Sequence, residues 1–338
     1  MKHIIAIQIL IAIFLLFLIM KPLVSQDLPL QNGEGPNEPV RTEEPARILS
    51  SRQLVFELEY EKYLIPYPYV YNYQGEERVF RFQDMIEKAS TAAAESEKGI
   101  LTYVSNYKDE NGRAPLYKGK TVDADGTLRG AAAPAYPTLT DQEEFDYLPD
   151  GTLVRILERH LKEDPEFSKI YSILDQKEYY MPNKYLQLDR QLEEIKKVIV
   201  VDLTNQTIAA LEKEIRQQYF KEANAYLRTD WKIISYSKAT TGKLGYYHQP
   251  TPVGYFYAME KKPFFYYLVD GTNVIGGQEP WAIRFTAGAY VHGMSLGEYS
   301  PAIGTVPLSH KCVRNYTSHA RFLYDWYEED RTIVIVIE

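Results

Sequence analysis

The pattern of hydrophobic and polar positions divides the chain into an apolar start, a polar connecting stretch and two longer regions. An unbroken apolar run covers residues 4–20, whereas Pro, Gly, Gln and Glu without any period fill residues 26–48. A stretch of that composition cannot bury enough apolar surface to fold, so we expect a flexible linker there. The boundaries predict a signal peptide or membrane anchor at 1–25, an accessory domain at 49–194 and a second domain at 195–338.

The accessory region combines short strand signals with one helix signal. Residues 84–97 include three consecutive alanines and predict a helix, and the Tyr- and Pro-rich residues 56–73 predict an extended segment. Residues 126–137 have loop composition, and residues 147–157 predict a turn that leads into a strand. Further strands are expected at 171–174 and 178–181. This order predicts a mixed α/β or small-barrel-like region, with a plain lid or scaffold as the open alternative.

The second region has the patterns of a mostly β domain with short helices. Strands are expected at 198–203, 207–211, 231–237, 255–258, 287–291 and 332–337. Ile215, Tyr219, Ala223 and Tyr226 fall at helical spacing, which predicts a helical insertion before Trp231. Near the C-terminus, Ser318 is expected to cap a helix with an apolar stripe.

Composition and charge narrow the classes of molecule that the protein could bind. The chain is 45% hydrophobic and 25% charged, as in ordinary globular proteins. Its net charge of -8 leaves no basic excess to neutralise phosphates, which excludes nucleic acid as the main partner.

The N-terminus indicates export to the cell envelope or periplasm. Lys2 and His3 precede the apolar run, and small residues follow it, as in a secretory signal. The run is also long enough for a retained anchor, so residues 4–20 are a possible membrane tether. An exported chain with one cysteine cannot form an internal disulfide, so Cys312 would persist as a free thiol. A buried cysteine acting as a small hydrophobe is the alternative.

The residues around Cys312 carry the strongest chemical signal. His292 and Gly293 end one predicted strand, and Cys312 follows His292 by 20 residues, close to Arg314. A thiolate nucleophile needs an imidazole to accept its proton and positive charge to hold its pKa down. Two adjacent strand ends could bring these side chains together.

This pattern resembles the signature of the L,D-transpeptidase (YkuD) family: a His-Gly pair, a loop, and Ser-His-Gly-Cys followed by an apolar residue and Arg or Asn. The matching positions are His292, Gly293, Gly304, Ser309, His310, Cys312, Val313 and Arg314. The resemblance implies a β-sandwich or barrel catalytic domain at 195–338. Lys311 departs from the family, because Gly is usual there. If the position needs a positive φ, lysine strains it, but it also adds a cation beside the thiol.

The resemblance also implies roles for the residues. Cys312 would attack a carbonyl of a diaminopimelate-type residue in a peptidoglycan stem peptide, with His292 as the base. The Gly293 carbonyl would orient the imidazole, and backbone N–H groups at Lys311 and Cys312 would hold the oxyanion. Three further residues would support the site: Ser309 and His310 as structural supports, and Arg314 as a brace or a partner of a substrate carboxylate.

An aromatic wall is expected to cover the substrate. The implied covering strands are residues 263–285, and the wall would consist of Phe264, Phe265, Tyr266, Tyr267 and Trp281. Tyr290, Trp281 and Phe285 are expected as substrate contacts, although ordinary core packing is an equal alternative for the wall. We expect no cofactor. A metal site of His292, His310 and Cys312 lacks a fourth ligand and is not favoured. Ser309 as nucleophile is disfavoured because no Gly-x-Ser-x-Gly elbow surrounds it.

The predicted function is that of a peptidoglycan L,D-transpeptidase, which cross-links or modifies stem peptides and so serves wall biosynthesis and cell shape. Two alternatives stay open. Water in place of the acceptor amine would make an L,D-carboxypeptidase, and loss of catalysis would leave a silent wall-binding protein. A thiol in register with an imidazole and Arg314 favours catalysis, since binding alone needs none of them. The oligomeric state is open.

Overall fold

The computed structural model describes residues 47–50, 55–60, 70–106, 132–192, 194–220, 225–245, 249–269, 274–295 and 301–338. The expected signal peptide or anchor at 1–25, with its apolar run, lies outside the described residues, as does the expected linker up to residue 46. Within the described part, no helix is both long and apolar enough to span a membrane. Residues Ala46–Glu338 cluster as one compact unit.

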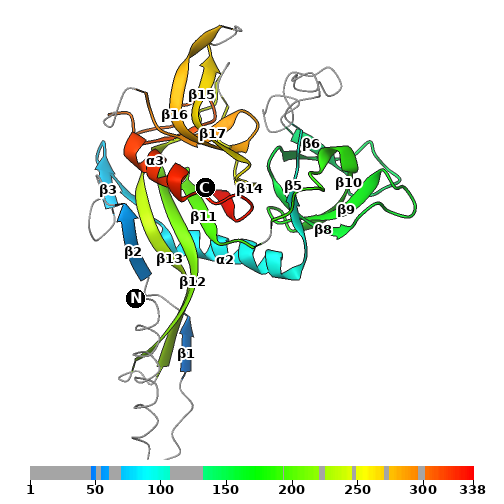
Figure 1. Ribbon diagram of the computed structural model, residues 1–338, viewed down its shortest axis with the longest axis horizontal. Helices are drawn as coiled ribbons and strands as arrows, with labels where there is room; N and C mark the ends of the chain where they lie inside the picture. Colours follow the sequence, from blue (N-terminus) through cyan, green and yellow to red (C-terminus); the bar gives the residue numbers. More distant parts are fainter. Residues whose placement is uncertain are drawn as a thin grey trace, which may run out of the picture. The chain divides into compact units, whose positions relative to one another are not determined.

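The dominant element is an 11-stranded sheet in the order β14-β19-β11-β12-β13-β18-β17-β16-β15, with β1 and β2 also paired to β13 (Figure 1). Its strands are β1 (Arg47–Ser50), β2 (Val55–Tyr60), β11 (Lys197–Asp202), β12 (Thr207–Phe220), β13 (Ala225–Thr240), β14 (Gly254–Tyr257), β15 (Glu260–Leu268), β16 (Ile275–Thr286), β17 (Ala289–His292), β18 (Val313–Asn315) and β19 (Thr332–Ile337).

The central strands are buried on both faces, which explains their continuous apolar runs. Successive side chains of a strand point to opposite faces. Val198, Val200 and Ile335 therefore belong to one core cluster, whereas Ile199 and Val334 belong to another. Helix α2 (Phe82–Lys98) contributes its apolar face to the first cluster, and α3 (Thr317–Trp326) contributes to the second. The sheet thus separates two cores, each closed by a helix.

Smaller sheets occupy the region before β11. Four strands pair in the order β10-β9-β8-β5, and two pairs stand apart, β3 with β4 and β6 with β7. The bounds are β3 (Val70–Tyr73), β4 (Glu76–Val79), β5 (Leu101–Tyr103), β6 (Ala132–Ala135), β7 (Asp146–Pro149), β8 (Leu153–Glu158), β9 (Phe167–Ser172), β10 (Lys177–Pro182) and a 3-10 turn η1 (Asn183–Tyr185). With α2 and α3 as the α-helices of the described residues, the expected mostly β fold is confirmed.

Three local predictions were wrong. The expected helix after residue 211 is instead the continuation of β12 and the start of β13. Apolar residues four apart fit one helix face but also one strand face, because four is an even number. Within the expected loop at 126–137, residues Ala132–Ala135 form β6. The last helix has Tyr316 at its N-cap without a side-chain hydrogen bond, so Ser318 lies inside α3 rather than capping it.

Candidate active site

The parallel pair β17–β18 places Cys312 next to His292. Val291 is opposite Val313 and His292 is opposite Arg314, and Cys312 directly precedes β18. Side chains two apart on a strand share a face, so His292, Cys312 and Arg314 lie on one side of the pair. Val291 and Val313 point into the core on the other side. The sequence predicted that two adjacent strand ends would bring these residues together, and the register of β17 and β18 agrees with that prediction.

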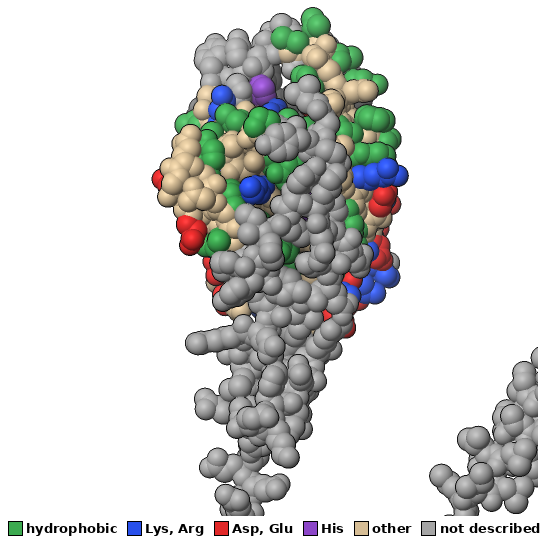
Figure 2. All heavy atoms as spheres, turned by 90° about the vertical axis from the view of Figure 1, so that its left-hand side faces the viewer, with side chains coloured by type: hydrophobic (Ala, Val, Ile, Leu, Met, Phe, Trp, Pro, Cys, Tyr) green, Lys and Arg blue, Asp and Glu red, His purple; other side chains and the backbone are tan. Residues whose placement is uncertain are grey.

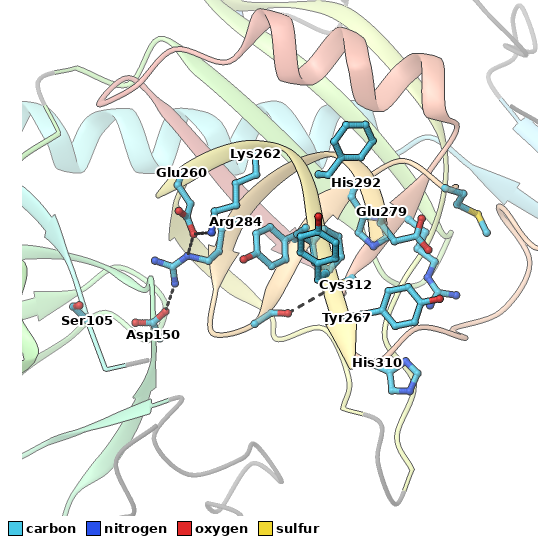
Figure 3. A pocket seen from close by; sticks show the side chains of 17 residues that line it. Ser105, Asp150, Glu260, Lys262, Tyr267, Glu279, Arg284, His292, His310 and Cys312 are labelled. Atoms are coloured by element: carbon cyan, nitrogen blue, oxygen red, sulfur yellow. Dashed lines mark hydrogen bonds and ion pairs between the residues drawn. The ribbon is translucent and has the colours of Figure 1, made fainter. Parts of the chain in front are cut away.

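The shared face opens into a cavity of about 1080 Å³ lined by Tyr290, His292, His310, Cys312 and Arg314, among others. Figure 3 shows Cys312 in its middle, with Glu260, Arg284 and Asp150 to one side in this view and His310 to the other.

Strand β15 supplies the aromatic part of the cavity wall. The Phe265 ring stacks on Tyr290 with centroids 4.3 Å apart and meets the His292 ring edge-on at 4.9 Å. Phe264, Tyr266 and Tyr267 also line the cavity and are exposed. Figure 2 shows hydrophobic side chains gathered on the upper part of its face, the level at which Figure 1 places β15 and β16. The expected aromatic wall is therefore made by consecutive residues of β15.

The surroundings of His292 keep its imidazole neutral. It is 1% exposed, and its Nδ1 lies 2.5 Å from the Gly293 carbonyl oxygen. Burial lowers the pKa of His292 to about 3, against the raising effect of the Gly293 carbonyl and with a further lowering by Arg314. A carbonyl can only accept, so Nδ1 carries the proton and Nε2 keeps its lone pair. The Gly293 N–H donates to the Pro280 carbonyl at 2.9 Å, which holds the orienting carbonyl in place.

The Cys312 thiol is half-buried and lies 3.9 Å from the Gly288 carbonyl oxygen. Burial raises the pKa of Cys312 to about 11, outweighing the lowering by a backbone hydrogen bond from Tyr290 and by the charges of Arg314 and Lys311. The expectation of a thiol pKa held down was therefore wrong in its net direction. Both cations act as expected, but the loss of hydration is larger.

Lys311 has the backbone conformation that favours glycine. Its φ is +125°, and it is 3% exposed. Its N–H donates to Ser309 Oγ at 3.3 Å, while the Ser309 hydroxyl donates to the Cys312 carbonyl. Ser309 is thus a support for the loop, as expected. The backbone N–H groups of Lys311 and Cys312 were both expected to hold an oxyanion. The Lys311 N–H already donates within the loop, so the Cys312 N–H is the candidate donor of the two.

Two other segments brace the loop before Cys312, residues 309–311. The Gly242 N–H donates to Thr251 Oγ1, and the Thr251 hydroxyl donates to the Lys311 carbonyl, each at 2.8 Å. Gln206 fixes the segment before Gly242, because its amide oxygen accepts from the Thr241 N–H at 2.9 Å and its amide nitrogen donates to the Thr241 hydroxyl at 2.8 Å. Polar residues of the segments that connect β11 to β12 and β13 to β14 therefore converge on the residue that precedes Cys312.

Comparison with known proteins finds a family for the region that holds this cavity. Residues 196–336 match the family model of the YkuD L,D-transpeptidase catalytic domain. This region is an L,D-transpeptidase catalytic domain. No curated protein sequence matches the chain.

Several solved structures resemble the chain at low identity. The L,D-transpeptidase from Mycobacterium smegmatis is 16% identical over 66% of this chain and 87% of that chain, with a TM-score of 0.34. L,D-transpeptidase 3 from Mycobacterium tuberculosis, in complex with a faropenem-derived adduct, is 18% identical over 62% and 78%, with a TM-score of 0.32. The catalytic domain from the E. faecium L,D-transpeptidase is 20% identical over 42% and 97%, with a TM-score of 0.30.

Two of the expected substrate contacts of the L,D-transpeptidase domain lie elsewhere. Phe285 is fully buried and packs edge-on against Phe256, so that expectation was wrong, because alternation along β16 turns it into the core. Trp281 is not among the residues that line the cavity; it packs against Tyr324 and Arg321 of α3. Tyr290 does line the cavity.

Sequence reasoning missed the polar and charged part of the cavity. Its members are Ser105, Asp150, Glu260, Lys262, Glu279 and Arg284. Glu260, Lys262 and Phe264 alternate along β15, a period that could have placed them on one face. Asp150 was recognisable only as part of a turn. In the described part of the chain, no group of three His, Cys, Asp or Glu side chains could hold a metal ion.

Proposed function

We propose that this protein is a peptidoglycan L,D-transpeptidase in which Cys312 is the nucleophile and His292 the general base. The observation that carries the proposal is the placement of both side chains on one face of β17–β18 and in one cavity. The lone pair of His292 Nε2 supports the same assignment, since Nδ1 is engaged by Gly293. A binding protein needs neither group in this register.

In the proposed reaction the thiol proton passes to Nε2 of His292 while the Cys312 sulfur attacks the stem-peptide carbonyl carbon. With a thiol pKa near 11 and an imidazole pKa near 3, a stable thiolate–imidazolium pair does not precede attack. Proton transfer and bond formation therefore proceed together. The Cys312 N–H supports the oxyanion. Collapse of the intermediate breaks the C–N bond, and the imidazolium returns the proton to the leaving amine.

The second half of the reaction regenerates the thiol. An amine of another stem attacks the thioester, loses its proton to His292, and displaces the sulfur, which is reprotonated. A water molecule in that place gives hydrolysis and a carboxypeptidase. The aromatic face of β15 supplies stacking surfaces for the stem or its sugar. We propose that the protein works in the cell envelope, where such substrates occur. Residues 4–20 would serve either as its export signal or as its membrane tether.

The direct test is intact-mass analysis of the full chain after incubation with a carbapenem, a strained acyl donor. We expect one covalent adduct on the wild type and none on Cys312→Ala. His292→Ala should stay folded but lose acylation. Its matched control is His319→Ala, because His319 is also a buried histidine with a pKa lowered to about 3 by burial but does not line the cavity. A folded wild type that stays unmodified would instead support a wall-binding protein.

The product of the second half decides the reaction type. A tetrapeptide-stem muropeptide is incubated with the enzyme and the products are weighed. A cross-linked dimer supports transpeptidation, whereas a tripeptide stem alone means hydrolysis and overturns the transfer step.

A further inference from the structure

The turn between β7 and β8 reaches the catalytic domain from the region before it. The Gly151 carbonyl accepts a hydrogen bond from the Tyr257 N–H at 2.9 Å, and Thr152 forms a β-bridge with Phe256. Gly151 has φ +85°, and a Cβ there would lie 2.0 Å from the Phe285 carbonyl oxygen. Only glycine allows so close an approach. The turn is therefore fitted tightly against β14 and the end of β16.

The same turn places a buried carboxylate on the cavity wall. Asp150 is 1% exposed, accepts from the Asn106 N–H at 2.9 Å, and lies 3.2 Å from Arg284 Nη1. Arg284 Nε in turn donates to Glu260 at 2.9 Å. These three charged residues line the cavity together with Cys312 (Figure 3). Removing the charge of Asp150 would leave Arg284 with Glu260, which is less buried, as its remaining carboxylate partner.

The contacts of this turn lead directly to the thiol. Phe285, which the turn contacts, lies three residues before Gly288, whose carbonyl lies 3.9 Å from the Cys312 sulfur. We propose that Asp150 is a positioning residue of the active site: with Gly151 it holds the end of β16, and through it Arg284 and the Gly288 carbonyl, in place against Cys312. The region before the catalytic domain would then complete the active site rather than merely adjoin it. This inference rests on Cys312 being the nucleophile proposed above.

The test compares two aspartates in the full chain. Asp150→Asn keeps an oxygen that can accept from Asn106 but loses the charge facing Arg284. The matched control is Asp202→Asn, because Asp202 is 0% exposed and pairs with Arg81 at 2.7 and 2.9 Å but does not line the cavity. Carbapenem acylation of Cys312 and its alkylation by iodoacetamide are followed by mass for both variants. A purely structural role lowers the folded fraction and changes both reactions alike in both variants.

We expect acylation to fall about ten-fold or more in Asp150→Asn, because it needs the wall aligned with the thiol. Alkylation, which needs an accessible thiolate but no aligned wall, should become faster in Asp150→Asn, and Asp202→Asn should match the wild type in both reactions. Equal acylation by Asp150→Asn and the wild type overturns the inference, as does an equal loss in Asp202→Asn. If the wild type itself is not acylated, the proposed function fails, and alkylation alone decides. Faster alkylation only in Asp150→Asn then supports the positioning role, and equal rates overturn it.

Discussion

Gly242 lies so close to Lys311 that a Cβ on Gly242 would stand 2.6 Å from the Lys311 Cα. The same Cβ would stand 2.3 Å from the Gln249 carbonyl oxygen. Both neighbours are backbone atoms, which cannot rotate away as a side chain could. The glycine therefore lets the chain after β13 press against the residue before Cys312.

We expect Gly242→Ala to displace the loop before Cys312, residues 309–311. A shift of about 1 Å at a reacting group costs on the order of 100-fold in rate, so carbapenem acylation should fall by about that factor. Gly99→Ala is the control, because the nearest atom to its Cβ would be the flexible Arg155 side chain at 3.5 Å. Acylation rates are measured by mass, and thermal unfolding checks that both variants fold. Equal rates for the two variants would show that the loop tolerates the added methyl group.

A second prediction concerns the lysine in the glycine position. Both Lys311→Gly and Lys311→Ala remove the side chain, but only glycine adopts φ +125° without strain. The strain of about 1–2 kcal/mol for an L-residue exceeds the extra chain entropy of glycine, so we expect the Gly variant to be more stable than the Ala variant by about 1 kcal/mol. Urea unfolding curves of the two variants measure this difference. A more stable Ala variant would mean that the backbone relaxes out of the positive φ.

Local signals predicted much of the fold. The β-branched run at 332–337 became β19, and the helix signal at 84–97 became most of α2, since both were strong and regular. The neighbouring positions of Cys312 and His292 could also be predicted from the sequence, because each residue belongs to a short motif at the end of a strand.

What the sequence did not reveal depends on long-range contacts. Asp150 lies on the cavity wall because a turn 134 residues before Arg284 packs there, a contact without a local signature. The net direction of the Cys312 pKa depends on burial, whereas the sequence displays only the neighbouring charges.

A third prediction follows from the two buried histidines. Burial lowers the pKa of His292 and of His319 to about 3 in the folded protein, whereas an unfolded histidine has a pKa of about 6.5. Between these values the unfolded chain binds more protons, so the free energy of unfolding falls as the pH drops below about 6.5. Each histidine contributes up to about 1.4 kcal/mol per pH unit.

Replacement of His319 should therefore flatten this dependence. We expect the unfolding free energy of His319→Gln to change less steeply between pH 6.5 and pH 5, by about 1 kcal/mol per pH unit relative to wild type. Urea unfolding at several pH values gives both curves. If the unfolding free energies of wild type and His319→Gln depended on pH in parallel, His319 would bind protons in the folded state as readily as in the unfolded chain.

The last prediction separates the reactivity of the free thiol from its reactivity with the base. Because burial raises the pKa of Cys312 to about 11, only about one molecule in a thousand carries a thiolate at pH 8. Alkylation by iodoacetamide, which needs the thiolate, should therefore keep rising about ten-fold per pH unit up to at least pH 9. Acylation by a carbapenem should instead change little between about pH 5 and pH 8, because His292 removes the proton during attack and stays neutral down to about pH 3. Arg314→Met removes a charge that lowers the thiol pKa, so its alkylation should be slower than that of the wild type at each pH.

An alkylation rate that is already constant above pH 7 would instead mean that the resting enzyme holds a preformed thiolate, and that His292 does not act as the base of the first step.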